Sequence, residues 1–168
     1  MAHEQHKQAA AQIKARCAVV TLSDSRTEAT DRSGARIREL LVAAGHSVAV
    51  YCLIPDDPGA LDALLNDLES DTAVDAILTN GGTGISKRDQ TMSVVMRHIQ
   101  THLSGFGELF RMLSFAQIGP GAMMSRAEAG IAGGKPLFAM PGSTAAVELA
   151  MTRLILPELG HLLYELRK

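Results

Sequence analysis

A glycine-rich stretch that ends in charged side chains is the part of this 168-residue sequence best suited to chemistry. It runs from Asn80 to Asp89 (NGGTGISKRD), after an apolar run from Val74 to Leu78. Glycines let the backbone turn sharply and approach a ligand, because no Cβ atom intervenes. A strand, a glycine turn and a helix start together favour anion binding, since free N–H groups and the positive helix end converge. The expected phosphate-binding residues are Gly81, Gly82, Thr83, Gly84, Lys87 and Arg88.

The carboxylate of Asp89 at the end of this stretch would repel a bare phosphate. Carboxylates and phosphates share a site when a divalent cation lies between them, so the sequence predicts Mg²⁺ there. Two alternatives remain open at this point. The glycines can form a turn that merely connects a strand to a helix, and Asp89 can cap the helix that begins near Gln90.

Two familiar nucleotide-binding motifs do not match this stretch. The P-loop requires a second glycine five residues after the first, and the residue five positions after Gly82 is Lys87. The dinucleotide fingerprint requires a final glycine, and the segment from Gly82 ends in the same lysine. The site is therefore not expected to belong to either class.

Short β-rich runs alternate with segments of helical periodicity along the chain. We expect strands over 18–22, 48–54, 74–79, 127–132 and 137–140. Apolar residues at helical spacing predict helices near 37–44, 58–68, 92–103 and 144–162, the last kinked at Pro157. This alternation predicts a three-layer α/β/α fold with a mainly parallel central sheet.

Polar or glycine-rich loops follow four of these strands, and parallel strands bring such loops to the same edge of the sheet. The loops contain Ser23-Asp24, Pro55-Asp56-Asp57, the Asn80–Asp89 stretch and Pro141-Gly142-Ser143. None of them contains a histidine, so a Ser-His-Asp set is not expected there. Phosphoryl or nucleotidyl transfer fits the loops better, because the protein then needs only to position phosphates and neutralise charge.

Within these loops, Asp56 and Asp89 are the expected catalytic pair and the expected metal ligands. Ser23, Asp24, Pro141, Gly142 and Ser143 are expected to contact substrate or nucleotide. Structural roles remain open as alternatives: Asp57 and Ser143 suit helix N-caps, and Asp24 and Asp31 suit loop caps.

Composition describes an ordinary globular chain, with 46% apolar and 20% charged residues. We expect a polar N-terminal extension over 1–15 and a single domain over 16–168. The chain has 16 basic and 18 acidic residues and no apolar run of ~20 residues, so we expect neither a nucleic-acid nor a membrane partner. We expect the protein to be located in the cytoplasm. Cys17 and Cys52 lie in predicted strands and are expected to be buried and inert. His98 and His102 are expected to be exposed.

The motifs together resemble those of the MoaB/Mog family of molybdenum-cofactor biosynthesis. The matching segments, in the order of the family, are Val20–Ser25, Asp31–Gly34, Ile54–Asp56, Thr79–Gly84, Arg88-Asp89, Gly105–Glu108, Ser125-Arg126 and Met140–Ser143. They extend from about residue 17 to the C-terminus, and the series as a whole is specific. The run from Gly105 to Phe115 is most similar to the MoaB branch.

The resemblance implies an ATP- and Mg²⁺-dependent molybdopterin adenylyltransferase that assembles as a trimer or hexamer. The terminal phosphate of molybdopterin would attack the α-phosphate of ATP and release pyrophosphate. Two aspartates important in the family match Asp56 and Asp89. The sequence departs from the family pattern after the glycine loop, where Asp-Val-Thr-Pro becomes Asp89-Gln90-Thr91-Met92.

A second interpretation remains open, because some MoaB members lack the aspartate that matches Asp56. In that case the protein binds or scaffolds molybdopterin without catalysis. The chain retains Asp56, which favours activity.

Overall fold

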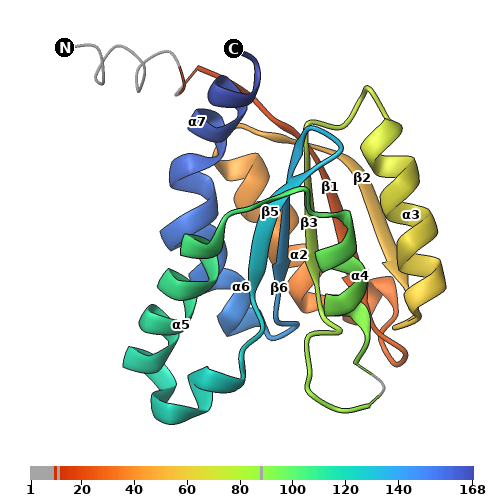
Figure 1. The fold of residues 1–168 in the computed structure, drawn as a ribbon, viewed down its shortest axis with the longest axis vertical. Helices are drawn as coiled ribbons and strands as arrows, with labels where there is room; N and C mark the ends of the chain where they lie inside the picture. Colours follow the sequence, from red (N-terminus) through yellow and green to blue (C-terminus); the bar gives the residue numbers. More distant parts are fainter. Residues whose placement is uncertain (1–9, 11, 88) are drawn as a thin grey trace.

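The structure is a computed structural model that describes residues 10, 12–87 and 89–168. Its centre is a six-stranded sheet in the order β2-β1-β3-β6-β5-β4 (Figure 1). The strands are β1 (Arg16–Leu22), β2 (Ser47–Ile54), β3 (Ala76–Asn80), β4 (Thr101–His102), β5 (Glu128–Ala132) and β6 (Lys135–Met140). The first four strands in spatial order pair in parallel, whereas β5 and β4 pair antiparallel at one edge. The expected mainly parallel sheet is confirmed.

Helices cover both faces of this sheet (Figure 1). They are α2 (Arg32–Ala43), α3 (Pro58–Ser70), α4 (Thr91–His98), α5 (Ser104–Ile118), α6 (Thr144–Ala150) and α7 (Leu156–Leu166). Short 3₁₀ turns occupy Glu28–Thr30 and Gly119–Met124, and a π-helical segment, Met151–Ile155, joins α6 to α7. Pro157 is the second residue of α7, two positions after the end of that segment. The expected interruption of the last helix is therefore present, because proline offers no N–H to an α-helical bond.

The alternating faces of the strands divide the core into two apolar clusters. One cluster packs the sheet against α2, α5, α6 and α7, with Ile37, Phe110 and Leu159 buried in it. The other packs the opposite face against α3 and α4, with Leu61 and Val95 buried in it. The fold is thus the predicted three-layer α/β/α arrangement.

The helix predicted over 92–103 is wrong in its second half. Helix α4 ends at His98, after which the backbone pairs with β5: the N–H of Gln100 donates to the Ile131 carbonyl at 2.8 Å, and that of Leu103 to the Ala129 carbonyl at 2.9 Å. Ile99 is still buried, which explains why its position fitted a helical pattern. Long-range strand pairing has overridden local periodicity here.

Strand β3 begins at Ala76, two residues later than expected. The N–H of Val74 donates to the Asp71 carbonyl at 3.1 Å and so closes a turn before the strand. The expectation of exposed histidines holds for His102 but is wrong for His98, which is buried between two carboxylates. Its Nδ1 lies 2.5 Å from Glu69 Oε1, and its Nε2 lies 3.0 Å from Asp62 Oδ1.

Both cysteines are unpaired. Cys17 is fully buried, and burial raises the pKa of its thiol to about 12. Cys52 is only half-buried, because it lies on the edge strand β2, which has a single neighbour.

Most of the predicted N-terminal extension, residues 1–9 and 11, lies outside the described residues. Of its remainder, Ala15 is buried and Ile13 packs against the first core cluster. Among the described residues, no helix has both the length and the apolar character needed to cross a membrane.

Candidate active site at the carboxyl edge of the sheet

Because β1, β2, β3 and β6 are parallel, the loops that follow them leave the sheet at one edge. The loop after β3 is the glycine-rich stretch, called here the glycine loop (residues 81–89). Its N–H at Gly81 donates to the carbonyl of Met140 at the end of β6, at 3.1 Å. A Cβ atom at Gly142 would lie 3.0 Å from the Gly81 Cα atom. The glycine loop and the Pro141-Gly142-Ser143 turn are therefore in contact.

Asp56, from the loop after β2, lies directly against the glycine loop. Gly82 has a φ of +65°, and a Cβ atom there would lie 2.9 Å from Asp56 Oδ1. The same carboxylate oxygen accepts a hydrogen bond from Thr91 Oγ1 at 2.6 Å. Thr91 is buried at the start of α4, so this bond fixes the orientation of the Asp56 carboxylate.

Asp24 joins the same group from the loop after β1. Its Oδ1 accepts a hydrogen bond from the backbone N–H of Asp56 at 3.0 Å. Asp24 thus holds the Asp56 loop in place. Asp57 has a different role, because its carboxylate accepts from the Ala60 N–H at 2.7 Å and caps α3, with Pro58 as the first helical residue. The helix-cap alternative is correct for Asp57.

Asp89 lies against the other end of the glycine loop. A Cβ atom at Gly84 would lie 2.5 Å from Asp89 Oδ2. That oxygen accepts hydrogen bonds from the Ser86 hydroxyl at 2.5 Å and from the Ser86 N–H at 2.8 Å. These bonds, the hydroxyl foremost, together with the charge of Arg126, lower the pKa of the Asp89 carboxyl. The carboxylate does not cap α4, whose N-cap residue is Gln90.

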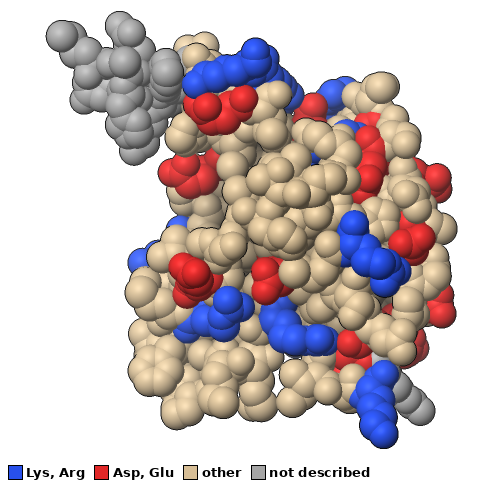
Figure 2. Space-filling view, in the orientation of Figure 1, with Lys and Arg blue, Asp and Glu red and all other residues tan. Residues whose placement is uncertain are grey.

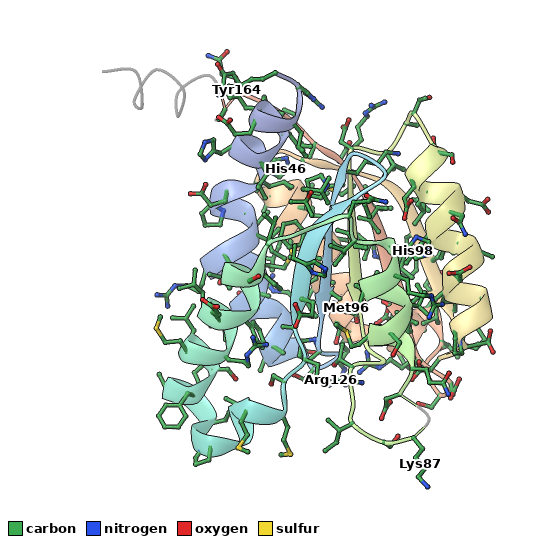
Figure 3. The ribbon with its side chains drawn as sticks, viewed as in Figure 1. His46, Lys87, Met96, His98, Arg126 and Tyr164 are labelled. Atoms are coloured by element: carbon green, nitrogen blue, oxygen red, sulfur yellow. The ribbon has the colours of Figure 1, made fainter. Side chains whose placement is uncertain are left out.

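A guanidinium group from the segment before β5 also reaches the glycine loop. Arg126 Nε donates to the Thr83 carbonyl at 3.1 Å. Its Nη2 donates to the Asp89 carbonyl at 3.0 Å and to the Gly84 carbonyl. Figure 3 shows Arg126 at the end of β5 nearest this loop.

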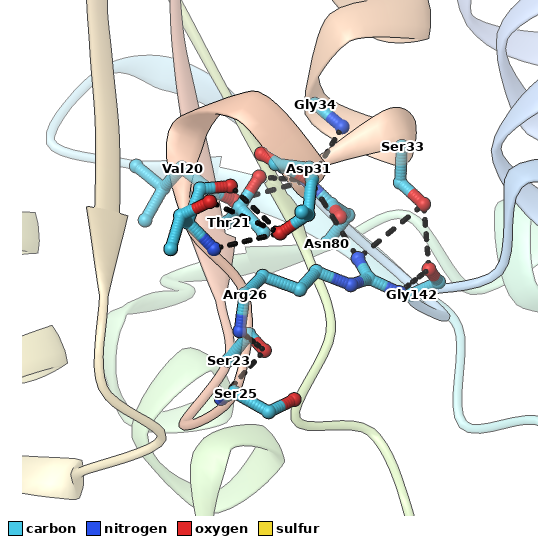
Figure 4. A network of polar contacts seen from close by, with 12 residues as sticks. Val20, Thr21, Ser23, Ser25, Arg26, Asp31, Ser33, Gly34, Asn80 and Gly142 are labelled. Atoms are coloured by element: carbon cyan, nitrogen blue, oxygen red, sulfur yellow. Dashed lines mark hydrogen bonds and ion pairs between the residues drawn. The ribbon is translucent and has the colours of Figure 1, made fainter.

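A second arginine supports the Pro141-Gly142-Ser143 turn (Figure 4). Arg26 Nη2 donates to the Gly142 carbonyl at 2.9 Å, and the Ser33 hydroxyl donates to the same oxygen at 2.6 Å. The guanidinium also lies 3.6 Å from the buried carboxylate of Asp31. This arrangement links the loop after β1 to the turn after β6.

Asp31 is the centre of that network and is 1% exposed. It accepts from the Gly34 N–H at 3.0 Å, which caps α2, and from the Tyr51 hydroxyl at 2.7 Å. Burial by itself would raise the pKa of the Asp31 carboxyl, but bonds from Thr21, Gly34 and Tyr51 and the charge of Arg26 outweigh it and lower the pKa. The group therefore remains an anion inside the protein.

Asn80, expected at the start of the loop, is the last residue of β3 and is fully buried. Its amide nitrogen donates to Thr21 Oγ1 at 2.9 Å and to the Val20 carbonyl at 3.3 Å. Its Oδ1 is a buried side-chain oxygen without a hydrogen-bond partner among the residues that the structure describes. The side chain joins β1 to β3 beneath the glycine loop.

The remaining predicted residues have varied environments. Ser23 Oγ accepts from the backbone N–H groups of Ser25 and Arg26, at 3.3 and 3.1 Å, and so shapes its own loop. Ser143 caps α6 by accepting from the Ala146 N–H at 3.2 Å. Lys87 is exposed at the far tip of the loop and points outward (Figure 3).

Of the other predicted residues, Thr83 is buried, Pro141 is half-buried, and Arg88 lies outside the described residues. Sequence reasoning missed Thr91, Arg26, Ser33 and Arg126 as parts of the site. Thr91 lies two positions after Asp89, Arg26 and Ser33 lie in or beside conspicuous polar loops, and Arg126 lies in one of the motifs that match the family. Nothing local shows what these side chains contact.

No group of three or more His, Cys, Asp or Glu side chains able to hold a metal ion is found in the described part of the chain. What the site offers is two carboxylates, each with one oxygen engaged: Asp56 Oδ1 by Thr91 and Asp89 Oδ2 by Ser86. Among the described residues, the other oxygen of each carboxylate accepts no hydrogen bond. Two such oxygens suit a hard cation that takes its remaining ligands from water and phosphate.

Comparison with known proteins agrees with this architecture. A family model described as "Probable molybdopterin binding domain" matches residues 18–161. The chain is 49% identical to molybdenum cofactor biosynthesis protein B of Halalkalibacterium halodurans over 169 aligned residues, which cover 100% of this chain and 99% of the relative. It is 46% identical to the protein of the same name from Bacillus subtilis, again over 100% of this chain and 99% of the relative.

Solved structures show the same likeness. A crystal structure of a molybdenum cofactor biosynthesis protein B has a TM-score of 0.90 and 49% identity, and the match covers 92% of this chain and 97% of that chain. The tungsten cofactor synthesizing protein MoaB from Pyrococcus furiosus has a TM-score of 0.81 and 34% identity, over 92% of this chain and 98% of that chain. These matches confirm the resemblance seen in the motifs: the chain belongs to the MoaB/Mog family of molybdenum-cofactor biosynthesis proteins.

Proposed function

We propose that this protein acts in molybdenum cofactor biosynthesis as a molybdopterin adenylyltransferase. In the proposed reaction, an oxygen of the terminal phosphate of molybdopterin forms a bond to the α-phosphorus of ATP. The bond between that phosphorus and the oxygen bridging to the β-phosphate breaks, and pyrophosphate leaves. Adenylylated molybdopterin is the other product. The observation that carries the proposal is the placement of Asp56 and Asp89 against Gly82 and Gly84 of one glycine loop.

Phosphates are anionic, and the glycine loop is suited to them. Its glycines keep side-chain atoms away from the backbone, and its amides can donate to phosphate oxygens. Arg126 adds a positive charge at the same loop. The turn around Gly142 touches the loop at Gly81, so a substrate that spans both segments would have its phosphates and its body on neighbouring walls.

The oxygen donors present fit Mg²⁺, and Asp56 and Asp89 would hold it through their free oxygens. When bound, Mg²⁺ would neutralise phosphate charge and bridge the substrate to the protein. The protein's own contribution is orientation. Thr91 fixes Asp56, Ser86 fixes Asp89, and the lowered pKa of Asp89 keeps it charged in neutral solution.

The proposed chemistry needs no nucleophile from the protein, because the attacking oxygen belongs to molybdopterin. This agrees with the composition of the four loops, which carry carboxylates, hydroxyls and glycines. Catalysis would then rest on bringing two phosphates together and neutralising their charge.

Transfer of label from ATP labelled at the α-phosphate to molybdopterin, in the presence of Mg²⁺, tests the proposal. We expect Asp89→Asn to lower turnover by at least ~100-fold, or about 2.7 kcal/mol of transition-state stabilisation, with molybdopterin binding retained. Asp57→Asn is the matched control, because Asp57 is the neighbour of Asp56 but its carboxylate caps α3. Unchanged turnover in the Asp89 variant would remove that residue from its proposed role. Molybdopterin binding without any transfer by the wild-type protein would favour the binding or scaffolding role instead.

We further propose that the working form is a homo-oligomer, as the family resemblance implies. Large apolar side chains are exposed together on α5 and on the turn that follows it, and the corresponding area in Figure 2 carries few charges. They are Leu109, Met112, Phe115, Ile118, Met123 and Met124. A second copy of the chain is the proposed occupant of this surface, in a trimer or hexamer.

Light scattering tests this assembly. Phe115→Asp should lower the mass toward that of one chain, because it places a charge in the apolar surface. Val42→Asp, at an exposed apolar position on α2, should leave the mass unchanged. An unchanged mass for the Phe115 variant would exclude this surface as the contact.

A further inference from the structure

Arg126 has a bonding pattern that the proposed chemistry does not yet explain. Its guanidinium donates to three backbone carbonyls of the glycine loop, those of Thr83, Gly84 and Asp89. The contacts bridge 37 to 43 positions of sequence. In the described part of the chain no Asp or Glu side chain lies within the 4.0 Å of an ion pair, although the charge of Arg126 acts on the Asp89 carboxylate.

The carbonyls that accept hydrogen bonds from Arg126 determine where the loop's amides point. In a planar trans peptide, the N–H of the next residue points opposite to the C=O. With the Thr83 and Gly84 carbonyls turned toward the guanidinium, the N–H groups of Gly84 and Ile85 point away from it. Two successive N–H groups on one side of a loop form a concave anion site.

These two amides are also available. Among the described residues, neither the Gly84 N–H nor the Ile85 N–H donates a hydrogen bond within the protein. Ile85 and Gly84 are exposed, so a ligand can reach them. Asp89, one of the two proposed metal-holding carboxylates, lies against Gly84. A phosphate on the two amides would therefore lie beside that carboxylate.

We propose that Arg126 is a positioning residue that sets the orientation of the Gly84 and Ile85 amides, and that these amides bind a phosphate group of the nucleotide or of the pyrophosphate product. The link to catalysis rests on the proposed function; the phosphate site itself does not. The guanidinium reaches these carbonyls from two separate nitrogens, Nε for Thr83 and Nη2 for Gly84 and Asp89, a fixed spacing that the single nitrogen of an ammonium group does not reproduce.

The test measures binding of Mg²⁺-pyrophosphate, without molybdopterin, to Arg126→Gln, Arg126→Lys and the wild-type protein by calorimetry. Lys135→Gln is the matched control: Lys135 likewise donates to backbone carbonyls, those of Leu68 and Asp71, but it lies at the start of β6, whereas the glycine loop bonds to Met140 at the end of that strand. We expect Arg126→Gln to weaken binding by at least about tenfold, Arg126→Lys to weaken it by less, and Lys135→Gln to stay within about twofold.

A spectroscopic signature separates positioning from a general loss of structure. In ¹⁵N-labelled wild-type protein, the amide resonances of Gly84 and Ile85 should shift on addition of Mg²⁺-pyrophosphate. In Arg126→Gln the same shifts should need at least about tenfold more Mg²⁺-pyrophosphate, while the resonances of core strand β1 keep their wild-type positions. If Arg126→Gln does not fold, the lysine variant carries the same test.

The inference would be overturned if a folded Arg126→Gln or Arg126→Lys variant bound Mg²⁺-pyrophosphate with wild-type affinity. It would also be overturned if the Gly84 and Ile85 resonances of the wild-type protein did not shift. Failure of the adenylyl transfer is a separate result. A protein that transfers no label but loses pyrophosphate affinity on replacement of Arg126 would still support the positioning role.

Discussion

The buried carboxylate of Asp31 allows the strength of the network beneath the site to be measured by substitution. Asp31→Ala removes the acceptor of the Gly34 N–H and of the Thr21 and Tyr51 hydroxyls, and it removes the partner of Arg26. Loss of an N-cap costs about 1 kcal/mol. Each donor left without a partner in a buried site costs a further ~1–3 kcal/mol. We expect the free energy of unfolding to fall by about 3–4 kcal/mol, since Tyr51 is only half-buried and water can replace part of its bond.

Asp57→Ala provides the matched comparison, because Asp57 caps α3 by the same type of bond, to the N–H three residues on, but at the surface. Its Oδ1 accepts from the Ala60 N–H at 2.7 Å and the residue is exposed. We expect this variant to lose only about 1 kcal/mol. The difference between the two variants measures what the buried bonds add to a helix cap.

Urea unfolding followed by circular dichroism gives both values, provided that the slope with urea concentration is unchanged. The loss should depend on pH in a defined direction. The pKa of Asp31 is lowered in the folded protein. Its contribution to the free energy of unfolding is therefore complete above the pKa of about 3.9 in the unfolded chain, and it disappears as the pH falls through the folded pKa. The reasoning would be refuted if the two variants lost the same free energy of unfolding at pH 7. It would also be refuted if the loss of free energy of unfolding in the Asp31 variant grew as the pH falls below about 4.

Three further substitutions or reactions test other parts of the structure. Gly82→Ala should lower AMP transfer at least ~10-fold, because the added Cβ meets Asp56 and Thr91. Gly134→Ala, in the turn between β5 and β6, also has a positive φ but has open space around it, so it should affect only stability, by about 1–2 kcal/mol. His98→Leu should lower the free energy of unfolding by about 1–2 kcal/mol in urea, because the largely buried Glu69 loses its partner, whereas Asp62 is exposed and keeps Arg97; full stability would argue against the bond to Glu69. The Cys17 thiol should not react with a disulfide reagent at about pH 8 in the folded protein, since burial raises its pKa to about 12, and rapid modification would contradict that placement.

The parts of the site that the sequence predicted are those whose meaning is local. A glycine run after an apolar strand is recognisable by itself, and so is an Asp-Pro pair that opens a helix, as at Asp57 and Pro58. The gathering of the four loops was also predictable. Strands that alternate with helices run parallel, and parallel strands place their carboxyl ends at one edge.

The errors came where distant residues decided the outcome. Residues 99–103 have helical periodicity, yet β5 pairs with this segment and ends α4 at His98. His98 looked like a surface residue because neither Asp62 nor Glu69 is near it in the sequence, 36 and 29 positions away. Local patterns carry no information about such partners.

The sequence by itself determined the chemical types at the site: glycines for a close backbone, carboxylates for a cation and capping residues for the helices. It also determined the family, through an ordered series of short motifs. Only the tertiary structure decided which groups act together: Thr91 with Asp56, Arg26 with the Gly142 carbonyl and Arg126 with the glycine loop. The physical reason is that these bonds join residues 35 to 116 positions apart, and their partners are fixed by the packing of the sheet and helices, which no short stretch of the chain encodes.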